Sequence, residues 1–118
     1  MHNTTTYKMG EVVPVPFPFS DQRTTKKRPS VVISCNTYNK NHLDLIIMAI
    51  TSQIPESLRF GELQIKNWKN AGLIQPSIIK PAITTIEKKS VIKKIGTLDK
   101  EDLEALLDNL KLLFNLTH

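Results

Sequence analysis

Apolar side chains alternate with prolines near the start of the chain, where residues 13–19 read Val-Pro-Val-Pro-Phe-Pro-Phe. An apolar period of two is typical of a β-strand. The three prolines remove backbone N–H groups from the same side of that strand, so this side cannot donate hydrogen bonds to a neighbour. We therefore expect an edge strand or a bulged strand end, followed by a polar hairpin connection over residues 20–27.

Two longer apolar runs, residues 30–34 and 43–50, predict strands in the interior of a sheet. The second run is too continuously apolar for a strand that has one face in water. Residues 35–42 separate the two runs and contain three asparagines, so we interpret them as a turn.

Shorter strands with glycine and proline between them follow the second run. They are expected at residues 62–65, 77–80 and 82–86, and Pro81 separates the last two. Residues 68–73 are predicted to turn the chain, with Gly72 supplying a positive φ. Trp68, the single tryptophan, is expected to pack in the core.

The C-terminal segment changes to a helical period, with apolar residues three and four positions apart. These residues are Leu103, Leu106, Leu107, Leu110, Leu113 and Phe114. Asp99 is the expected N-cap, and Glu101 and Asp102 occupy the first turn, where the helix dipole favours negative charge. We expect the stripe to pack on the sheet, and its width also allows a dimer contact.

These elements predict an α+β, mainly β fold: an SH3-like small barrel of about five to seven strands with one long C-terminal helix. A chain of 118 residues is long enough for one domain with a modest core. We assign this domain to residues 9–118, and we interpret residues 1–8, rich in threonine and asparagine, as a flexible segment.

Basic residues exceed acidic ones, 16 against 11, and the net charge of +5 favours a polyanionic partner. They cluster over residues 23–28, beside a strand start, and over residues 88–94, which we interpret as a solvated face. No apolar run reaches the roughly 20 residues that span a bilayer. The N-terminus also lacks the order of a secretory signal. We therefore expect a cytoplasmic protein that does not contact a membrane.

Few side chains are candidates for nucleophilic or metal chemistry. Cys35 is the only cysteine, and because it follows an apolar strand we interpret it as a half-buried structural thiol. The histidines, His2, His42 and His118, lie near the termini or in a predicted turn. The carboxylates are scattered without the spacing of metal ligands, so we expect no metal and no other cofactor.

The order of several segments resembles the PemK/MazF family of toxin endoribonucleases from Met9 to about Leu113. Two of them contain the residues that match the catalytic pair: Lys-Arg-Pro-Ser-Val-Val-Ile-Ser at residues 27–34 and Ala-Ile-Thr-Ser-Gln at residues 49–53. Each segment is weak by itself, and the resemblance rests on their order. The other segments that match are residues 10–13, 16–21, 38–39, 68, 71–73, 76–77, 84–86 and 94–98.

The resemblance implies a homodimeric, metal-independent endoribonuclease that cuts single-stranded RNA at short sequences. The 2′-OH would attack the phosphate and leave 2′,3′-cyclic phosphate and 5′-OH ends. Arg28 and Thr51 match the catalytic pair of the family. A labile antitoxin, with which the toxin would also bind DNA, would lay its acidic segment over the basic RNA groove. The loop at residues 20–27 is short and lacks glycine, so sequence recognition by this loop is not carried over.

The chemistry of the pair suits this role. An arginine side chain stays protonated and presents a fork of donors to phosphate oxygens, and Pro29 favours an extended backbone at Arg28. Thr51 is too weak an acid to serve as a base, so we expect its hydroxyl to hydrogen-bond the scissile phosphate. The residues expected to contact the RNA are Lys26, Lys27, Ser52, Gln53 and Phe19, the last by stacking on a base unless it packs in the core.

Two other functions remain open. A CcdB-like toxin has the same fold and binds DNA gyrase without cutting any substrate, but it is expected to lack the Arg28–Pro29 and Thr51 pair and to use residues of the C-terminal helix. A basic barrel that binds RNA without cleaving it is the other alternative, because activity depends on exact placement of the reacting groups.

Overall fold

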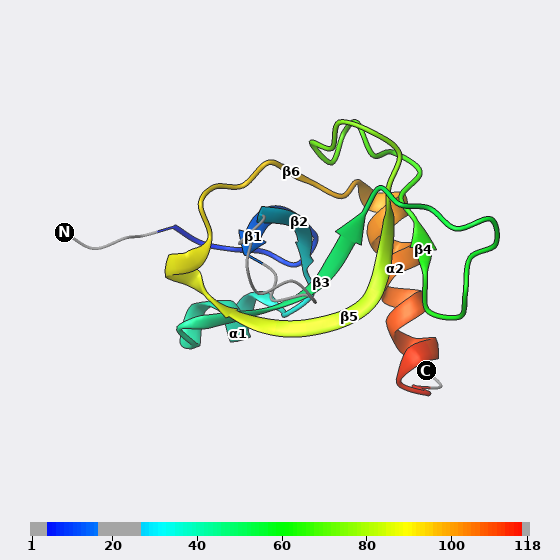
Figure 1. The fold of residues 1–118 in the computed structure, drawn as a ribbon. Helices are drawn as coiled ribbons and strands as arrows, with labels where there is room; N and C mark the ends of the chain where they lie inside the picture. The colour runs from blue at the N-terminus through cyan, green and yellow to red at the C-terminus, as the bar shows by residue number, and fades with distance from the viewer. Residues whose placement is uncertain (1–4, 17–26, 117–118) are drawn as a thin grey trace.

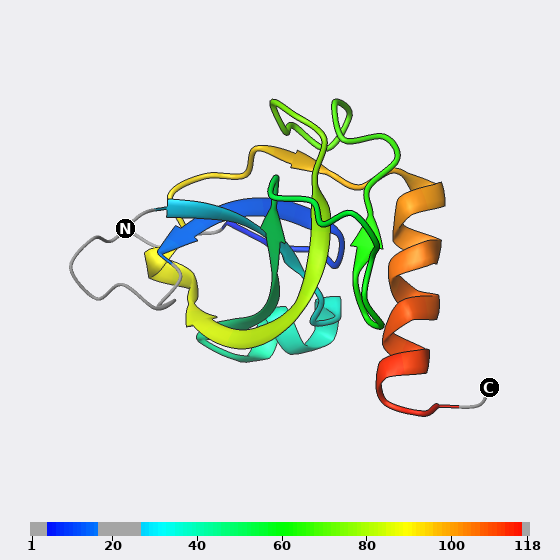
Figure 2. The ribbon, with the colours of Figure 1, turned by 45° about the vertical axis from the view of Figure 1, so that its right-hand side comes forward.

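The computed structural model describes residues 5–16 and 27–116, and its main feature is a six-stranded antiparallel sheet with the strand order β4-β5-β3-β2-β1-β6. The sheet curls into a half-barrel, and the long helix α2 stands beside it (Figures 1 and 2). The elements are β1 (Glu11–Pro16), β2 (Lys27–Val32), α1 (Asn36–Asn41), β3 (Asp44–Thr51), β4 (Leu63–Gln64), β5 (Ile78–Glu87), the 3₁₀ helix η1 (Lys88–Ser90), β6 (Gly96–Thr97) and α2 (Lys100–Leu113). The predicted small barrel with a long C-terminal helix is confirmed.

Strand β3 lies between β5 and β2 and is buried on both faces, which explains its unbroken apolar run. Its residues alternate between two core clusters: Ile47 and Ala49 pack in one, and Met48 and Ile50 pack in the other. The second cluster also contains Leu106 of α2, so it fills the space between sheet and helix. The prediction of an interior strand here is confirmed.

The prolines of β1 lie where the strand has a neighbour on one side only. β1 pairs with β2 through Pro16, but with β6 only at Glu11 and Val12. Ile95 N–H donates to the Val12 carbonyl over 2.9 Å, so this side of β1 faces β6. Pro14 and Pro16 share that orientation and lie beyond the end of β6. The predicted edge position is confirmed for them, while residues 17–19 and most of the hairpin connection lie outside the described residues.

The prediction of two strands separated by Pro81 is wrong, because residues 78–87 form the single strand β5. The pairing with β3 shifts register between Met48 and Ile50, where the β5 partners are Ile83 and Ile79. β5 therefore carries two more residues than β3 across this stretch, and Pro81 lies in the resulting bulge. A bulge leaves ladder positions unpaired, so a proline is tolerated there without ending the strand.

The prediction of a turn over residues 35–42 is also wrong, since residues 36–41 form α1. The amide of Asn39 is buried and donates to the carbonyls of Tyr7 and Ser34, each over 3.0 Å. These bonds attach the helix to both the N-terminal segment and the end of β2. Cys35 is the N-cap residue and is exposed, which corrects the expectation of a half-buried thiol.

The segment of residues 1–8, interpreted as flexible, is described from residue 5 onward, and Tyr7 within it is packed in the first core cluster. Lys94 places its amine over the Tyr7 ring, 5.3 Å from the centroid.

Helix α2 begins as predicted, because the Asp99 carboxylate accepts the Asp102 N–H over 2.9 Å. Its apolar stripe is divided. Leu106 is fully buried, whereas Phe114, just beyond the helix, is 58% exposed. Only part of the stripe therefore packs on the sheet, and the rest is exposed. A dimer contact through the exposed part stays a prediction. Trp68 is half-buried and packs against the same cluster from outside, so the expected core position is met only in part.

Candidate active site

The pairing of β2 with β3 brings Arg28 and Thr51 together. Ser30 lies opposite Ala49 in this antiparallel pair. The pairing runs from Val32–Ile47 to Ser30–Ala49, and Arg28 and Thr51 lie two residues beyond its last pair, at the same end of the two strands. Residues far apart in the sequence therefore meet because β2 begins where β3 ends.

A cleft of about 220 Å³ opens at this point. Its lining comes from the start of β2, the end of β3 and the segment before β5, and consists of Arg28, Pro29, Ile50, Thr51, Ser52, Gln53, Ile74, Gln75 and Ser77. Arg28 is exposed, and no described carboxylate forms an ion pair with it. Among the described residues, no carboxylate therefore competes with an anion for the guanidinium donors of Arg28.

The hydroxyl oxygen of Thr51 accepts a hydrogen bond from the backbone. Gln53 N–H donates to Thr51 Oγ1 over 3.1 Å, in a tight turn that ends β3. Because that bond uses a lone pair of the oxygen, the hydroxyl proton remains available to donate to a ligand. Ser52 Oγ next to it accepts a 3.2 Å hydrogen bond from Gln75 Nε2, which ties the two walls of the cleft together.

The predicted site residues are distributed unequally around this cleft. Ser52 and Gln53 line it together with Arg28 and Thr51. Lys27 is exposed at the start of β2 but does not line the cleft. Lys26 and Phe19 lie outside the described residues.

Ile74, Gln75 and Ser77 line the cleft but were not identified from the sequence. Residues 71–73 and 76–77 of their segment match the family, but the resemblance assigns no role to them, and the return of the segment to the end of β3 depends on the pairing of β5 with that strand. No local signal could have found them.

A second hollow of about 260 Å³ shares Thr51 and Gln53 with the cleft. It also contains Arg59 and Lys80, and Arg59 pairs with Glu62 over 3.5 Å.

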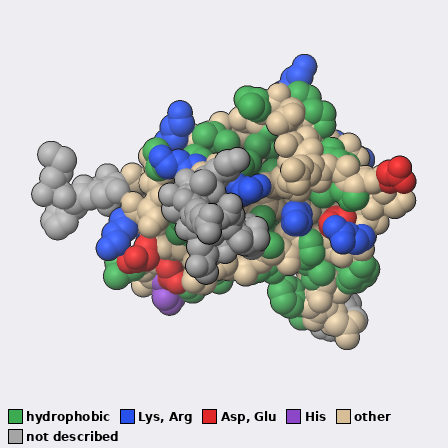
Figure 3. Space-filling model, viewed as in Figure 1, with side chains coloured by type: hydrophobic (Ala, Val, Ile, Leu, Met, Phe, Trp, Pro, Cys, Tyr) green, Lys and Arg blue, Asp and Glu red, His purple; other side chains and the backbone are tan. Residues whose placement is uncertain are grey.

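The basic side chains are not confined to this region. Figure 3 shows Lys and Arg side chains spread over one face of the molecule.

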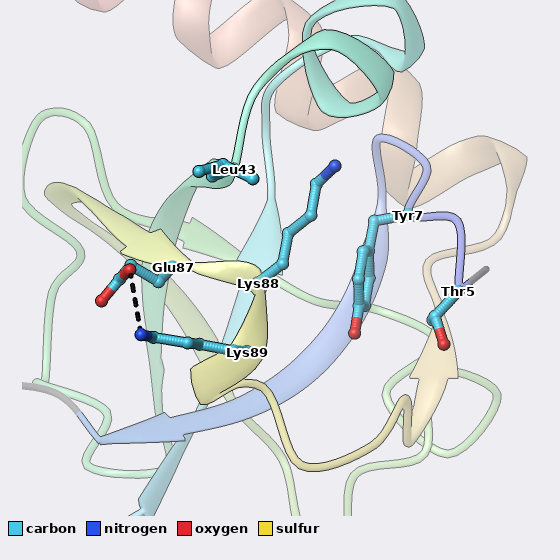
Figure 4. A pocket seen from close by; sticks show the side chains of 6 residues that line it. All are labelled: Thr5, Tyr7, Leu43, Glu87, Lys88 and Lys89. Atoms are coloured by element: carbon cyan, nitrogen blue, oxygen red, sulfur yellow. Dashed lines mark ion pairs between the residues drawn. The ribbon is translucent and has the colours of Figure 1, made fainter. Parts of the chain in front are cut away.

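A further hollow of about 360 Å³ lies at the opposite end of β3 and β5 (Figure 4). The Lys88 side chain extends between Leu43 and Tyr7, and Lys89 pairs with Glu87 over 3.6 Å. The lysine cluster of residues 88–94 therefore lies away from the Arg28–Thr51 cleft.

Within residues 5–16 and 27–116, no three His, Cys, Asp or Glu side chains gather closely enough to hold a metal ion. No helix in this part of the chain has the length and apolar character needed to cross a membrane.

Several solved structures have the same fold as this chain. A Mycobacterium tuberculosis toxin, MazF-mt6, superposes with a TM-score of 0.74 at 18% identity, covering 92% of this chain and 99% of its own. An endoribonuclease in complex with its cognate antitoxin, from a mycobacterial species, gives 0.73 at 13% identity, covering 98% and 99%. A MazE–MazF structure from Deinococcus radiodurans gives 0.73 at 14% identity, covering 96% and 99%. The fold is thus that of MazF-type toxins.

Comparison of the sequence with family profiles then identifies the family. The profile of one family, the PemK-like, MazF-like toxins of type II toxin–antitoxin systems, matches residues 8–114. The chain belongs to this family. A search of curated proteins finds no match.

Proposed function

We propose that this toxin is a sequence-specific, metal-independent endoribonuclease that cleaves single-stranded RNA at the Arg28–Thr51 cleft. The observation that carries the proposal is that both residues line one cleft although they come from different strands. Membership of the toxin family and the likeness to an endoribonuclease of the same fold support it.

Arg28 is proposed to stabilise the charge of the reacting phosphate. Attack of the 2′-OH adds negative charge to the non-bridging oxygens, and a preorganised cation beside them lowers the barrier. Arg28 meets this need because it is exposed, projects from an extended strand and has no described ion-pair partner. Its charge supplies the stabilisation that a metal ion supplies in other nucleases.

Thr51 is proposed to position the same phosphate. The Gln53 N–H holds the hydroxyl oxygen at 3.1 Å and leaves its proton free to donate to a phosphate oxygen. Ser52 and Gln53 extend the polar surface, and Lys27 adds positive potential at the strand start. The net charge of +5 would attract the RNA from a distance.

Two partners besides RNA belong to this proposal. An antitoxin with an acidic segment would cover the cleft, and solved structures of the same fold contain an antitoxin. A second copy of the chain would cover exposed apolar side chains such as Leu107, Leu112 and Phe114. We expect the assembly to function in the cytoplasm.

The test is incubation of purified protein with mixed-sequence single-stranded RNA in EDTA, followed by mapping of the fragment ends. Wild type should cut at discrete sites and leave 5′-OH ends. Arg28→Ala should lower the rate about 10²- to 10³-fold, the loss seen when one transition-state donor is removed. Thr51→Val should also slow cleavage. Lys40→Ala and Thr85→Val, exposed and distant from the cleft, are the matched controls.

Cutting by folded Arg28→Ala at the wild-type rate would contradict the assignment of this residue. Cleavage that disappears in EDTA and returns with a divalent cation would contradict metal independence. A folded wild type that cuts no RNA would favour the CcdB-like alternative, which a gyrase supercoiling assay then tests directly.

A further inference from the structure

The segment between β4 and β5 forms one wall of the Arg28–Thr51 cleft. Ile74, Gln75 and Ser77 come from this segment and face a second wall made by the end of β3. A nucleotide bound at the cleft would therefore have its phosphate near Arg28 and its base within reach of residues 74–77.

This wall is held in place by backbone contacts at both of its ends. Gly72 has a φ of +83°, and a side chain there would overlap the backbone of Ile95. Leu73 N–H donates to the Trp68 carbonyl over 3.1 Å. At the other end, the buried Ser77 donates its hydroxyl to the Gln75 carbonyl over 2.9 Å. These contacts hold the backbone on both sides of Gln75, and the hydrogen bond to Ser52 orients its exposed side chain.

The Gln75 amide has hydrogen-bonding capacity left over. One N–H of Nε2 donates to Ser52 Oγ over 3.2 Å. An amide has two donor hydrogens and an acceptor oxygen, so one donor hydrogen and the acceptor oxygen remain for a ligand. That pair is complementary to a base whose Watson–Crick edge has an amino group next to an unprotonated ring nitrogen, as in adenine and cytosine. The corresponding ring nitrogen of guanine carries a hydrogen, and glutamine pairs with an amino group and ring nitrogen of adenine in nucleic-acid complexes.

Ile74 provides the apolar surface that such a base needs. Its side chain is 91% exposed and lines the same cleft. Its neighbour Leu73 is half-buried and packs against the second core cluster. The side chain of Leu73 therefore faces the core, whereas that of Ile74 faces the cleft. A base whose edge bonds to Gln75 would cover Ile74 with its flat face and remove that surface from water.

We propose that Gln75, supported by Ile74, determines specificity by recognising adenine or cytosine in the RNA bound in the cleft. The proposal rests on the proposed nuclease function and assigns its sequence selectivity to the wall before β5. Gln75 contacts the base and takes no part in the bond-breaking step.

The test compares wild type, Gln75→Ala and Gln75→Glu on an RNA library randomised around the cleavage site, with cut positions read by sequencing. Gln64→Ala, an exposed glutamine of β4 outside the cleft, is the matched control. Wild type and the control should favour adenine or cytosine over uracil at one position by about 5- to 100-fold, the range for a good bidentate pair. Gln75→Ala should lose this preference at that position only. Gln75→Glu keeps an acceptor for a base amino group but has no N–H for the ring nitrogen, so it should shift the preference from adenine toward cytosine. Replacing adenine there by unsubstituted purine tests the amino group itself, and comparison of adenine with cytosine identifies which base is read.

Identical preferences in wild type and Gln75→Ala would overturn the inference while leaving the nuclease intact. A wild type that cuts nothing would instead be a failure of the proposed function. Recognition is then measured by fluorescence anisotropy with homo-oligodeoxynucleotides of adenine, cytosine or thymine, which lack the reacting 2′-OH. Tighter binding of adenine or cytosine that disappears in Gln75→Ala supports the inference, and equal binding of all three overturns it.

Discussion

Asp102 connects α2 to the segment that carries the cleft wall, and its replacement by asparagine is a sharp test of the fold. The carboxylate belongs to a residue that is only 2% exposed. Its two oxygens accept hydrogen bonds from Lys66 N–H and Asn67 N–H, each over 2.9 Å. An asparagine side chain at this position would keep one acceptor oxygen and place an NH₂ donor against the other backbone N–H.

The expected cost follows from these bonds. A hydrogen bond to a charged group contributes about 1.5–3 kcal/mol, and a buried donor left unpaired costs about 1–3 kcal/mol. Because the two terms overlap, we expect Asp102→Asn to lower the free energy of unfolding by about 2–4 kcal/mol. The backbone N–H of residue 102 still reaches Asp99, so the helix start should survive.

Urea unfolding followed by Trp68 fluorescence measures this change, because Trp68 is the only tryptophan and lies half-buried beside the affected segment. The midpoint should fall while the denaturant slope stays constant. Asp108→Asn, on an exposed position of the same helix, is the control for loss of charge. A free energy of unfolding equal in wild type and Asp102→Asn would refute this account of how α2 is attached.

Three further predictions concern other positions. Gly72→Ala should lower the free energy of unfolding by at least about 2 kcal/mol in the same assay, because φ is +83° and a methyl group would overlap neighbouring backbone; a smaller loss would mean that the loop relaxes. Ser30→Ala should be neutral or stabilising by up to about 1 kcal/mol, because its buried hydroxyl has no described partner, and a clear loss would reveal one. A hydrogen bond to Asp44, then burial and the Asp44 charge, raise the pKa of Tyr38 above its ordinary value of 10.0. The bond therefore stabilises the fold below that ordinary pKa, and this contribution is lost as pH rises through the raised pKa. Asp44→Ala should move the phenolate titration of Tyr38 to lower pH and leave that of Tyr7 unchanged; an unmoved titration would contradict the assigned cause.

The sequence by itself determined the features that depend on near neighbours in the chain. The Asp99 cap and the leucine period define α2, and the unbroken apolar run of β3 indicates burial on both faces. The prolines of β1 indicate a side without a hydrogen-bonded neighbour, and Gly72 adopts the positive φ expected of it. Each of these signals lies within one element, so backbone sterics and the spacing of side chains suffice to interpret it.

Features that depend on distant segments were decided by the tertiary structure. Residues 36–41 have poor helical propensity. They form a helix because the buried amide of Asn39 donates hydrogen bonds to the carbonyls of Tyr7 and Ser34. Pro81 stays within a strand because β5 bulges opposite β3. The sequence nominated Arg28 and Thr51 through a family resemblance, but only strand register places them at one cleft.

The cleft wall between β4 and β5 also depends on the tertiary structure. Gln75 and Ile74 lie between two short pieces that match the family but belong to neither, and they meet the end of β3 only after β5 has paired with it. Local propensity is fixed by a few neighbouring residues, whereas a site assembled from three strand ends is fixed by contacts formed on folding of the whole chain.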